Sequence, residues 1–125
     1  MHKPNEIVLK RAYDPVGTDD GYRALVDGLW PRGCSKASLK LDEWAKLLAP
    51  TQATRKAYGH DPPLWETFRH DYGRELAQSA QQERMRALLT AAAGRRLTLV
   101  YAAHDGLHSN AEVLHEALLR MVKSS

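Results

Sequence analysis

The side chains best suited to chemistry in this sequence follow short apolar runs that are typical of buried strands. Asp27, Trp30 and Arg32 come after the second run, and His108 and Asn110 come after the third. In open α/β sheets, ligands collect beyond the carboxyl ends of the strands, where loops and helix N-termini converge. We therefore expect these side chains to share one site. Their guanidinium, carboxylate, imidazole and amide groups can together hold a phosphate or carboxylate and assist proton transfer.

Each candidate residue has an expected role at this site. Asp27 and His108 are the candidate catalytic residues, with Asp27 orienting the ligand or acting as a base. Arg11, at the end of the first apolar run, and Arg32 are expected to bind the anion. The candidate ligand-binding residues are Arg11, Trp30, Arg32, Lys36, Tyr101 and Asn110. No cofactor is indicated.

The same residues also have a purely structural interpretation. Asp27 and Arg32 can pair with each other and fix the Trp-Pro turn between them, and Arg11 can pair with the acidic turn at 19–20. Trp30, next to a proline, is typical of a packing anchor. These alternatives stay open at the level of sequence.

A metal site and a reactive thiol are the other possibilities that the sequence raises. His104, Asp105 and His108 have ligand-type side chains within one loop, but their spacing does not match a structural zinc site, so no metal site is predicted. Cys34 is the single cysteine, which excludes a disulfide within the chain. A nucleophilic Cys34 would need its pKa lowered by the basic residues two positions to either side. A passive thiol in a loop is the simpler interpretation.

The elements that must position these residues follow from apolar periodicity and capping patterns. Strands are predicted over residues 6–11, 22–27 and 97–103. Four helices are predicted. The first lies between Thr51 and Gly59, and the second covers residues 65–76. The third begins at a capping box at 79–82 and ends at Gly94, and the fourth begins at a second capping box at 109–112. Residues 39–48 fit either strand alternation or a helix capped by Asp42, and a short helix is favoured.

These elements predict one α/β domain over residues 1–125. The expected architecture is a small, mostly parallel sheet of three to four strands flanked by helices, in a Rossmann-like three-layer arrangement. The continuous apolar run at 97–103 is typical of a central strand that is covered on both faces. The link between the first two strands is short for a helical crossover, which leaves their relative direction open.

Composition narrows the class of protein. The chain has 125 residues, of which 43% are hydrophobic, and a formal net charge of +3. Its basic residues are spread along the sequence and interleaved with acids, which disfavours nucleic acid as a partner. The charge balance permits an anionic small molecule as a partner but does not require one. No apolar run is long enough for a membrane span or a signal peptide, so we expect a cytoplasmic protein without a membrane partner. The oligomeric state is left open.

The residues also carry a family resemblance that covers nearly the whole chain. Its most distinctive segment runs from Leu25 to Gly33 and contains Trp-Pro-Arg-Gly. Further matching segments are residues 9–14, 19–21, 35–36, 44–46, 49–51, 59–61, 97–103 and 110–111. On these residues the sequence resembles the YeaO-like family of bacterial proteins, a domain of unknown function (number 488). The resemblance implies a compact α/β fold and no activity that can be carried over.

Two positions depart from the pattern of that family. Gly28 stands where the family usually has arginine, and Thr51 stands where serine is common. If the missing guanidinium contacts a ligand in the relatives, this chain has altered or weakened that function.

Two hypotheses of function follow. The first is a small enzyme, or a decayed relative of one, that acts on an anionic small molecule, with a nucleotide-like compound as one option. It predicts one pocket containing Arg11, Asp27 and Arg32. The second is a module that binds protein or nucleic acid through a contiguous positive patch and exposed aromatic side chains. The first is favoured because the polar residues follow strand ends rather than one helix face.

Overall fold

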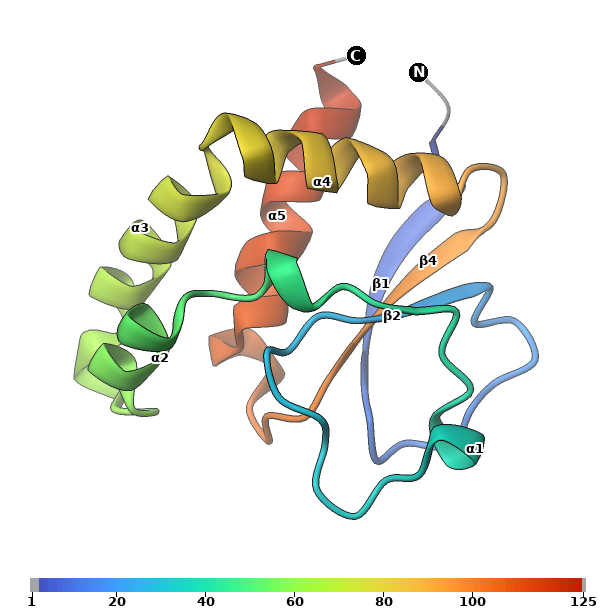
Figure 1. Ribbon diagram of the computed structural model, residues 1–125, viewed down its shortest axis with the longest axis horizontal. Coiled ribbons are helices and arrows are strands. Elements are labelled where there is room, and N and C mark those ends of the chain that lie inside the picture. Colours follow the sequence, from blue (N-terminus) through green and yellow to red (C-terminus); the bar gives the residue numbers. More distant parts are fainter. Residues whose placement is uncertain (1–2, 125) are drawn as a thin grey trace.

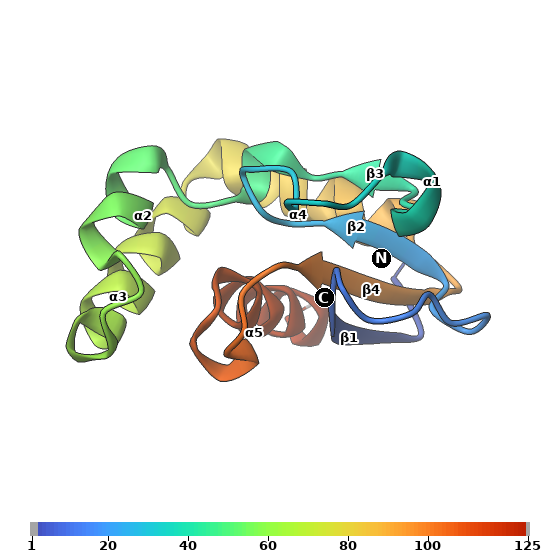
Figure 2. The same ribbon diagram turned by 90° about the horizontal axis from the view of Figure 1, so that it is seen from below.

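The computed structural model describes residues 3–124 and contains a four-stranded sheet. The strands are β1 (Glu6–Arg11), β2 (Tyr22–Leu25), β3 (Glu43–Trp44) and β4 (Arg96–Tyr101). They are all parallel and lie in the order β1-β4-β2-β3 (Figure 2). The predicted α/β class is confirmed, and the direction of the first two strands is parallel, since both pair with β4.

Strand β4 is the centre of the sheet because it pairs with β1 on one side and β2 on the other. Its side chains alternate between two cores, as the period of two in a strand requires. Leu97 and Leu99 belong to the larger core, whereas Val100 belongs to the smaller core on the opposite face. The apolar residues of β4 are fully buried, which confirms the prediction of a central strand covered on both faces.

Helices cover the larger core on one face of the sheet (Figure 1). They are α2 (Gln52–Tyr58), α3 (Trp65–Leu76), α4 (Ser79–Ala91) and α5 (Asn110–Lys123). Each of the last three buries residues at helical spacing: Phe68, Tyr72 and Leu76 on α3, Met85, Leu88 and Leu89 on α4, and Ala111, Leu114 and Leu118 on α5. Apolar stripes of this width are what a surface helix needs to pack on a sheet.

The opposite face has a thinner cover. The short helix α1 (Lys36–Leu39) places Leu39 against Leu25 and Val100 of the sheet. Residues from the surrounding loops, including Trp30 and Cys34, complete this smaller core. The sheet is therefore covered on both faces, by helices on one and by α1 with its neighbouring loops on the other.

The predicted helix within residues 39–48 is wrong. The chain there forms the two-residue strand β3 and then a 3₁₀ turn over Lys46–Leu48. Asp42, expected to cap a helix, instead accepts a hydrogen bond from the Arg23 backbone N–H (2.8 Å), and its own N–H donates to the Arg23 carbonyl (2.8 Å). Because Asp42 forms these hydrogen bonds with the edge of β2, the segment stays extended and does not form a helix.

The predicted helix caps have mixed outcomes. Thr51 caps α2 by accepting a hydrogen bond from the Thr54 N–H (3.3 Å), as predicted. Ser109 caps α5 by accepting from the Glu112 N–H (3.3 Å), but the Glu112 side chain does not complete the predicted capping box. The capping box at 79–82 is wrong, because α4 begins after Gln78 without a side-chain cap. Gln82, the expected reciprocal partner, instead donates to the Leu76 carbonyl (2.8 Å) and so ties α4 to the end of α3.

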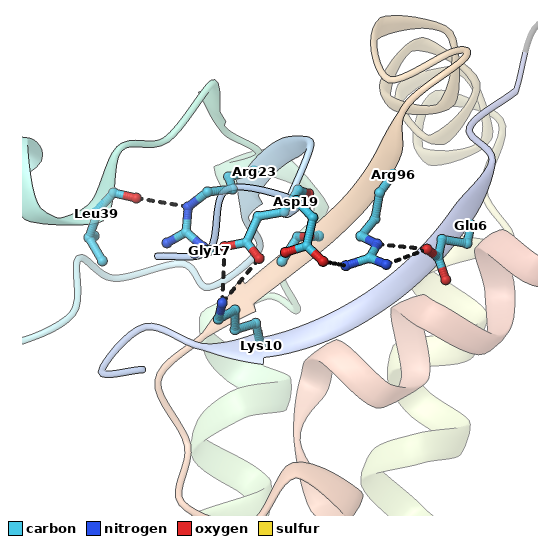
Figure 3. A network of polar contacts seen from close by, with 9 residues as sticks. Glu6, Lys10, Gly17, Asp19, Arg23, Leu39 and Arg96 are labelled. Atoms are coloured by element: carbon cyan, nitrogen blue, oxygen red, sulfur yellow. Dashed lines mark hydrogen bonds and ion pairs between the residues drawn. The ribbon is translucent and has the colours of Figure 1, made fainter. Parts of the chain in front are cut away.

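A buried ionic cluster centred on Asp20 lies on the side of the sheet away from the large helices (Figure 3). The Asp20 carboxylate accepts hydrogen bonds from Lys10 (3.0 and 3.1 Å), the Arg23 guanidinium (2.8 Å) and the Gly17 N–H (2.9 Å). Burial alone would raise the pKa of Asp20, but the Gly17 hydrogen bond and the Lys10 ammonium outweigh it and hold the pKa below its ordinary value. The Asp20 carbonyl also accepts from Thr98 of β4 (2.6 Å).

The contacts of this cluster also test the structural interpretation in which Arg11 pairs with the acidic turn at 19–20. That interpretation is wrong, because Lys10 and Arg23 take Asp20, while Arg96 pairs with Asp19 (3.3 Å). The strand side chains alternate in direction, so Lys10 reaches the turn and its neighbour Arg11 points to the opposite face.

We predict that Asp20→Asn lowers the free energy of unfolding at pH 7 by about 3–5 kcal/mol, because it leaves Arg23 and Lys10 without their counter-charge in a buried setting. The matched control is Asp19→Asn, which removes an exposed partner of Arg96 and should cost less than about 1 kcal/mol. Urea denaturation measures both changes. Equal effects of the two variants would contradict the central place given to Asp20.

Candidate functional site

A cleft of about 1010 Å³ opens at the carboxyl ends of β2 and β4. The loop after β2 contributes residues from Asp27 to Arg32, and the segment after β4 contributes Ala102, Ala103 and residues 108–110. The facing wall comes from the 3₁₀ turn at 46–48, the start of α2 and parts of α3 and α4. Parallel strands deliver their following loops to one edge of the sheet, which is where ligands bind in open α/β folds.

Five of the residues expected to form a site line this cleft. They are Asp27, Trp30, Arg32, His108 and Asn110. They arrive from two loops that are far apart in sequence, and the parallel pairing of β2 with β4 brings those loops together. The remaining expected residues, Arg11, Lys36 and Tyr101, are not part of the lining.

Asp27 lies at the inner end of the cleft, where the pairing of β2 and β4 gives way to loops. Its Oδ2 accepts a hydrogen bond from the Ala102 N–H (2.9 Å), while its Oδ1 is buried without a hydrogen-bond partner. Burial raises the pKa of Asp27 above its ordinary value, although the Ala102 N–H, Asn110 and the charge of His60 act in the opposite direction. The carboxyl is therefore easier to protonate than an exposed aspartate and is not paired with Arg32.

The tryptophan of the Trp-Pro-Arg-Gly segment holds the turn in shape. The Trp30 Nε1–H donates to the Cys34 carbonyl (2.6 Å), and the ring meets Trp44 edge-on at 5.4 Å between centroids. Trp44 in turn donates from its Nε1 to the Asp27 carbonyl (2.7 Å). These bonds fix the backbone on both sides of Arg32, whose own carbonyl accepts from the Tyr13 hydroxyl (3.1 Å). The exposed guanidinium of Arg32 is thus presented by a braced turn.

His108 and Asn110 hold the other loop of the cleft. The His108 Nδ1 lies 2.5 Å from the Asp105 carboxylate, and its ring meets Trp65 edge-on at 5.1 Å. This contact with His108 lowers the pKa of Asp105. Asn110 donates to the Val26 carbonyl (3.1 Å), which ties the start of α5 to the end of β2. His108 is therefore oriented by Asp105 rather than by Asp27.

The three expected residues outside the lining have structural contacts. Arg11 donates from Nε to the Ala103 carbonyl (3.0 Å), and its guanidinium lies 5.3 Å from the centroid of the Tyr13 ring, which does line the cleft. Tyr101 is buried under the loop after β4, and Lys36 begins α1. Arg11 thus supports the wall of the cleft from behind. The expectation that Arg11 shares one pocket with Asp27 and Arg32 is not met.

The cleft also contains basic residues that the strand-end argument does not find. Lys46, Arg55 and Arg84 line it, together with His60. They come from the 3₁₀ turn, from α2, from the segment after α2 and from α4, so no strand-end pattern marks them. His60 adopts a left-handed backbone (φ 58°), a conformation that side chains other than glycine rarely take and that recurs at functional sites.

Glu75 fixes the position of α2 at this wall. Its carboxylate accepts hydrogen bonds from the Thr51 N–H (2.9 Å), the Thr51 hydroxyl (3.0 Å) and the Thr54 hydroxyl (2.5 Å). The first turn of α2 is thereby attached to α3, and Arg55 is carried on the next position of the same helix.

Residues 3–124 contain neither a cluster of metal ligands nor a membrane-spanning helix. Within this range, no group of three histidine, cysteine or acidic side chains is arranged to hold a metal ion. None of the helices in the same range is long and apolar enough to cross a membrane.

Comparisons with known proteins identify relatives along almost the whole chain. The family model described as "Inactive DUF488-N3 subclade" matches residues 6–125. The uncharacterized protein YeaO of Escherichia coli (strain K12) is 44% identical over 112 residues, which cover 90% of this chain and 96% of that protein. The uncharacterized proteins Mb3100c of Mycobacterium bovis and Rv3073c of Mycobacterium tuberculosis are each 34% identical over 119 residues, covering 94% of this chain and 98% of each relative. No solved structure matches significantly.

We predict that Asp27 makes stability fall with rising pH. Because the pKa of Asp27 is raised in the folded state, its contribution is fully present below the unfolded value, at about pH 4, and is lost as the pH rises through the folded value. Asp27→Asn removes this titration, so the wild-type protein should lose stability relative to the variant as the pH rises from about 4.

Urea denaturation between about pH 4 and pH 8 measures this difference, a range that starts near the ordinary aspartate pKa. Asp14→Asn, at an exposed position outside the cleft, is the control for the loss of a surface charge. Parallel curves for the wild-type protein and Asp27→Asn would contradict the prediction.

We also predict that Gly28→Arg is structurally tolerated. A Cβ at this position would meet only the Ala49 side chain, at an ordinary 3.5 Å, and Gly28 has no positive φ. The free energy of unfolding should stay within about 0.5 kcal/mol of the wild-type value. Gly21→Ala is the contrasting variant, because Gly21 has φ +68° and its Cβ would lie 2.3 Å from the Arg96 carbonyl. Thermal or urea unfolding should separate the two variants clearly.

Proposed function

The chain belongs to the DUF488 family of YeaO-like proteins, and we propose that it binds an anionic small molecule in the cleft between the ends of β2 and β4. One observation carries this proposal: the basic side chains Arg32, Lys46, Arg55 and Arg84 all line one cleft. Guanidinium groups match phosphate and carboxylate oxygens in geometry as well as in charge. A cleft with several of them favours an anionic ligand.

The acidic residues of the cleft, Asp27 and Glu75, are held by contacts within the protein. Asp27 has a raised pKa because it is buried, and the carboxylate of Glu75 is engaged by Thr51 and Thr54. The hydrogen-bonding capacity of Glu75 is thus largely used within the protein. The basic side chains supply the hydrogen-bond donors of the cleft, whereas the Oδ1 of Asp27 is buried and has no hydrogen-bond partner.

Binding without catalysis is the form of this proposal that the site favours. An acid–base mechanism needs a base held within reach of the reacting proton and oriented for it. His108 is oriented by Asp105, and Asp27 receives its hydrogen bond from a backbone N–H, so these two candidates do not form a pair. The description of the matching family model as inactive agrees with a binding role.

The alternative of a nucleic-acid-binding module has less support. Nucleic acid binders present a stripe of basic residues that follows the phosphate backbone. Here the basic residues of the candidate site converge on a concave surface, and the rest of the chain mixes both signs of charge. A cleft of this size suits a small molecule, since ligand sites are concave and commonly enclose several hundred Å³.

The test is a thermal-shift screen of nucleotides, sugar phosphates and carboxylates, followed by calorimetry on the best ligand. A ligand at about a hundred times its dissociation constant should stabilise the folded state by about 2.7 kcal/mol. Arg32→Ala and Arg55→Ala should each weaken binding about tenfold or more, the usual effect of losing a charged hydrogen bond. Gly28→Arg should strengthen it by adding a cation to the cleft.

Arg74→Ala is the matched control, because Arg74 is exposed on α3 and does not line the cleft. Its affinity should equal that of the wild-type protein. Unchanged affinity in both Arg32→Ala and Arg55→Ala, or equal losses in Arg74→Ala, would place the binding site elsewhere.

A further inference from the structure

Two leucines in the lining of the cleft are exposed to solvent. Leu29 is 62% exposed and Leu47 is 66% exposed, and both line the same cleft as the basic residues. Single exposed leucines are common on protein surfaces and need no explanation. Two of them inside one concave surface are different, because apolar groups in a cleft usually provide contact area for a ligand.

The backbone at both leucines is held in place by hydrogen bonds from neighbouring side chains. Leu29 immediately precedes the turn that Trp30 braces through the Cys34 carbonyl. Leu47 sits in the 3₁₀ turn at 46–48, and its carbonyl accepts a hydrogen bond from the Gln81 side chain on α4 (2.8 Å). A backbone that is already fixed loses no further conformational entropy when its side chains contact a ligand, which favours the use of these leucines in binding.

Each leucine also has a basic residue close by in sequence that lines the cleft with it. Lys46 directly precedes Leu47, and Arg32 follows Leu29 by three positions in the same loop. The two walls of the cleft thus each combine an apolar side chain with a cation. A compact anion such as inorganic phosphate would contact the cations and leave both leucines in water.

We propose that the ligand is an amphipathic anion: a phosphate or carboxylate joined to an alkyl or aryl group, with the apolar group packed against Leu29 and Leu47. This inference rests on the proposed function and adds the chemical class of the ligand to it. The anionic group engages the basic residues of the cleft. The apolar group removes the two leucines from water.

The experiment is a calorimetric titration with inorganic phosphate and with monoalkyl phosphates of increasing chain length, kept below their aggregation concentrations. A parallel series of alkanoates distinguishes the two anionic groups. Affinity should rise with chain length, by up to about fourfold for each methylene that is buried. Aryl phosphate should bind more tightly than inorganic phosphate for the same reason.

Leu29→Gln and Leu47→Gln test the contact itself, since both change an exposed apolar side chain to a polar one of similar size. Each should flatten the dependence of affinity on chain length and leave the affinity for inorganic phosphate unchanged. Leu107→Gln is the matched control, because Leu107 is 74% exposed but does not line the cleft. It should retain the wild-type dependence on chain length, and circular dichroism checks that all three variants are folded.

The possible failures are distinguishable. If anions bind with an affinity that Arg32→Ala weakens, but chain length has no effect, the amphipathic ligand is refuted and the proposed function stands. If Leu107→Gln reduces the dependence of affinity on chain length as much as the cleft variants do, the proposed contact with Leu29 and Leu47 is refuted. If neither series binds and no anion in the thermal-shift screen stabilises the protein, the proposed function itself fails.

Discussion

The parallel pairing of β2 with β4 is the constraint on which the rest of this structure depends. It places Leu25 opposite Val100, and the ladder continues one residue further with a bond from the Val26 N–H to the Val100 carbonyl (3.0 Å). Beyond that point the Asp27 side chain takes the Ala102 N–H in place of a backbone carbonyl. The end of the sheet and the inner end of the cleft are therefore the same place.

The two faces of the sheet meet different physical demands. One face is closed by α3, α4 and α5 through a continuous apolar core. The other has less apolar cover and contains the Asp20 cluster, in which Lys10 and Arg23 compensate a buried carboxylate. Buried charges are costly unless they are paired and hydrogen-bonded, and here the backbone N–H of Gly17 completes the set. The loop between β1 and β2 is held to the sheet by this cluster in place of a helix.

The cleft combines a rigid backbone frame with side chains that can contact a ligand. Trp30, Trp44 and Asn110 use their N–H groups to hold backbone carbonyls around Asp27, so the loops are fixed by bonds within the protein. The side chains that line the cleft include a set of cations and two exposed leucines. Gly28 adds open space to the cleft, since a Cβ at this position would meet only the Ala49 side chain.

The sequence by itself determined the α/β class, three of the strands, the helices with apolar stripes, and the loop residues Asp27, Arg32 and Asn110 that meet at one edge. Periodicity and caps are local properties, so they are readable along the chain. The tertiary structure alone decided that residues 43–44 form an edge strand, because they pair with β2 and the preceding Asp42 is hydrogen-bonded to Arg23. It also decided that Arg11 lies outside the lining of the cleft and that Arg55, His60 and Arg84 line it. Those placements depend on how α2 and α4 pack against loops far away in sequence, and no local pattern encodes that packing.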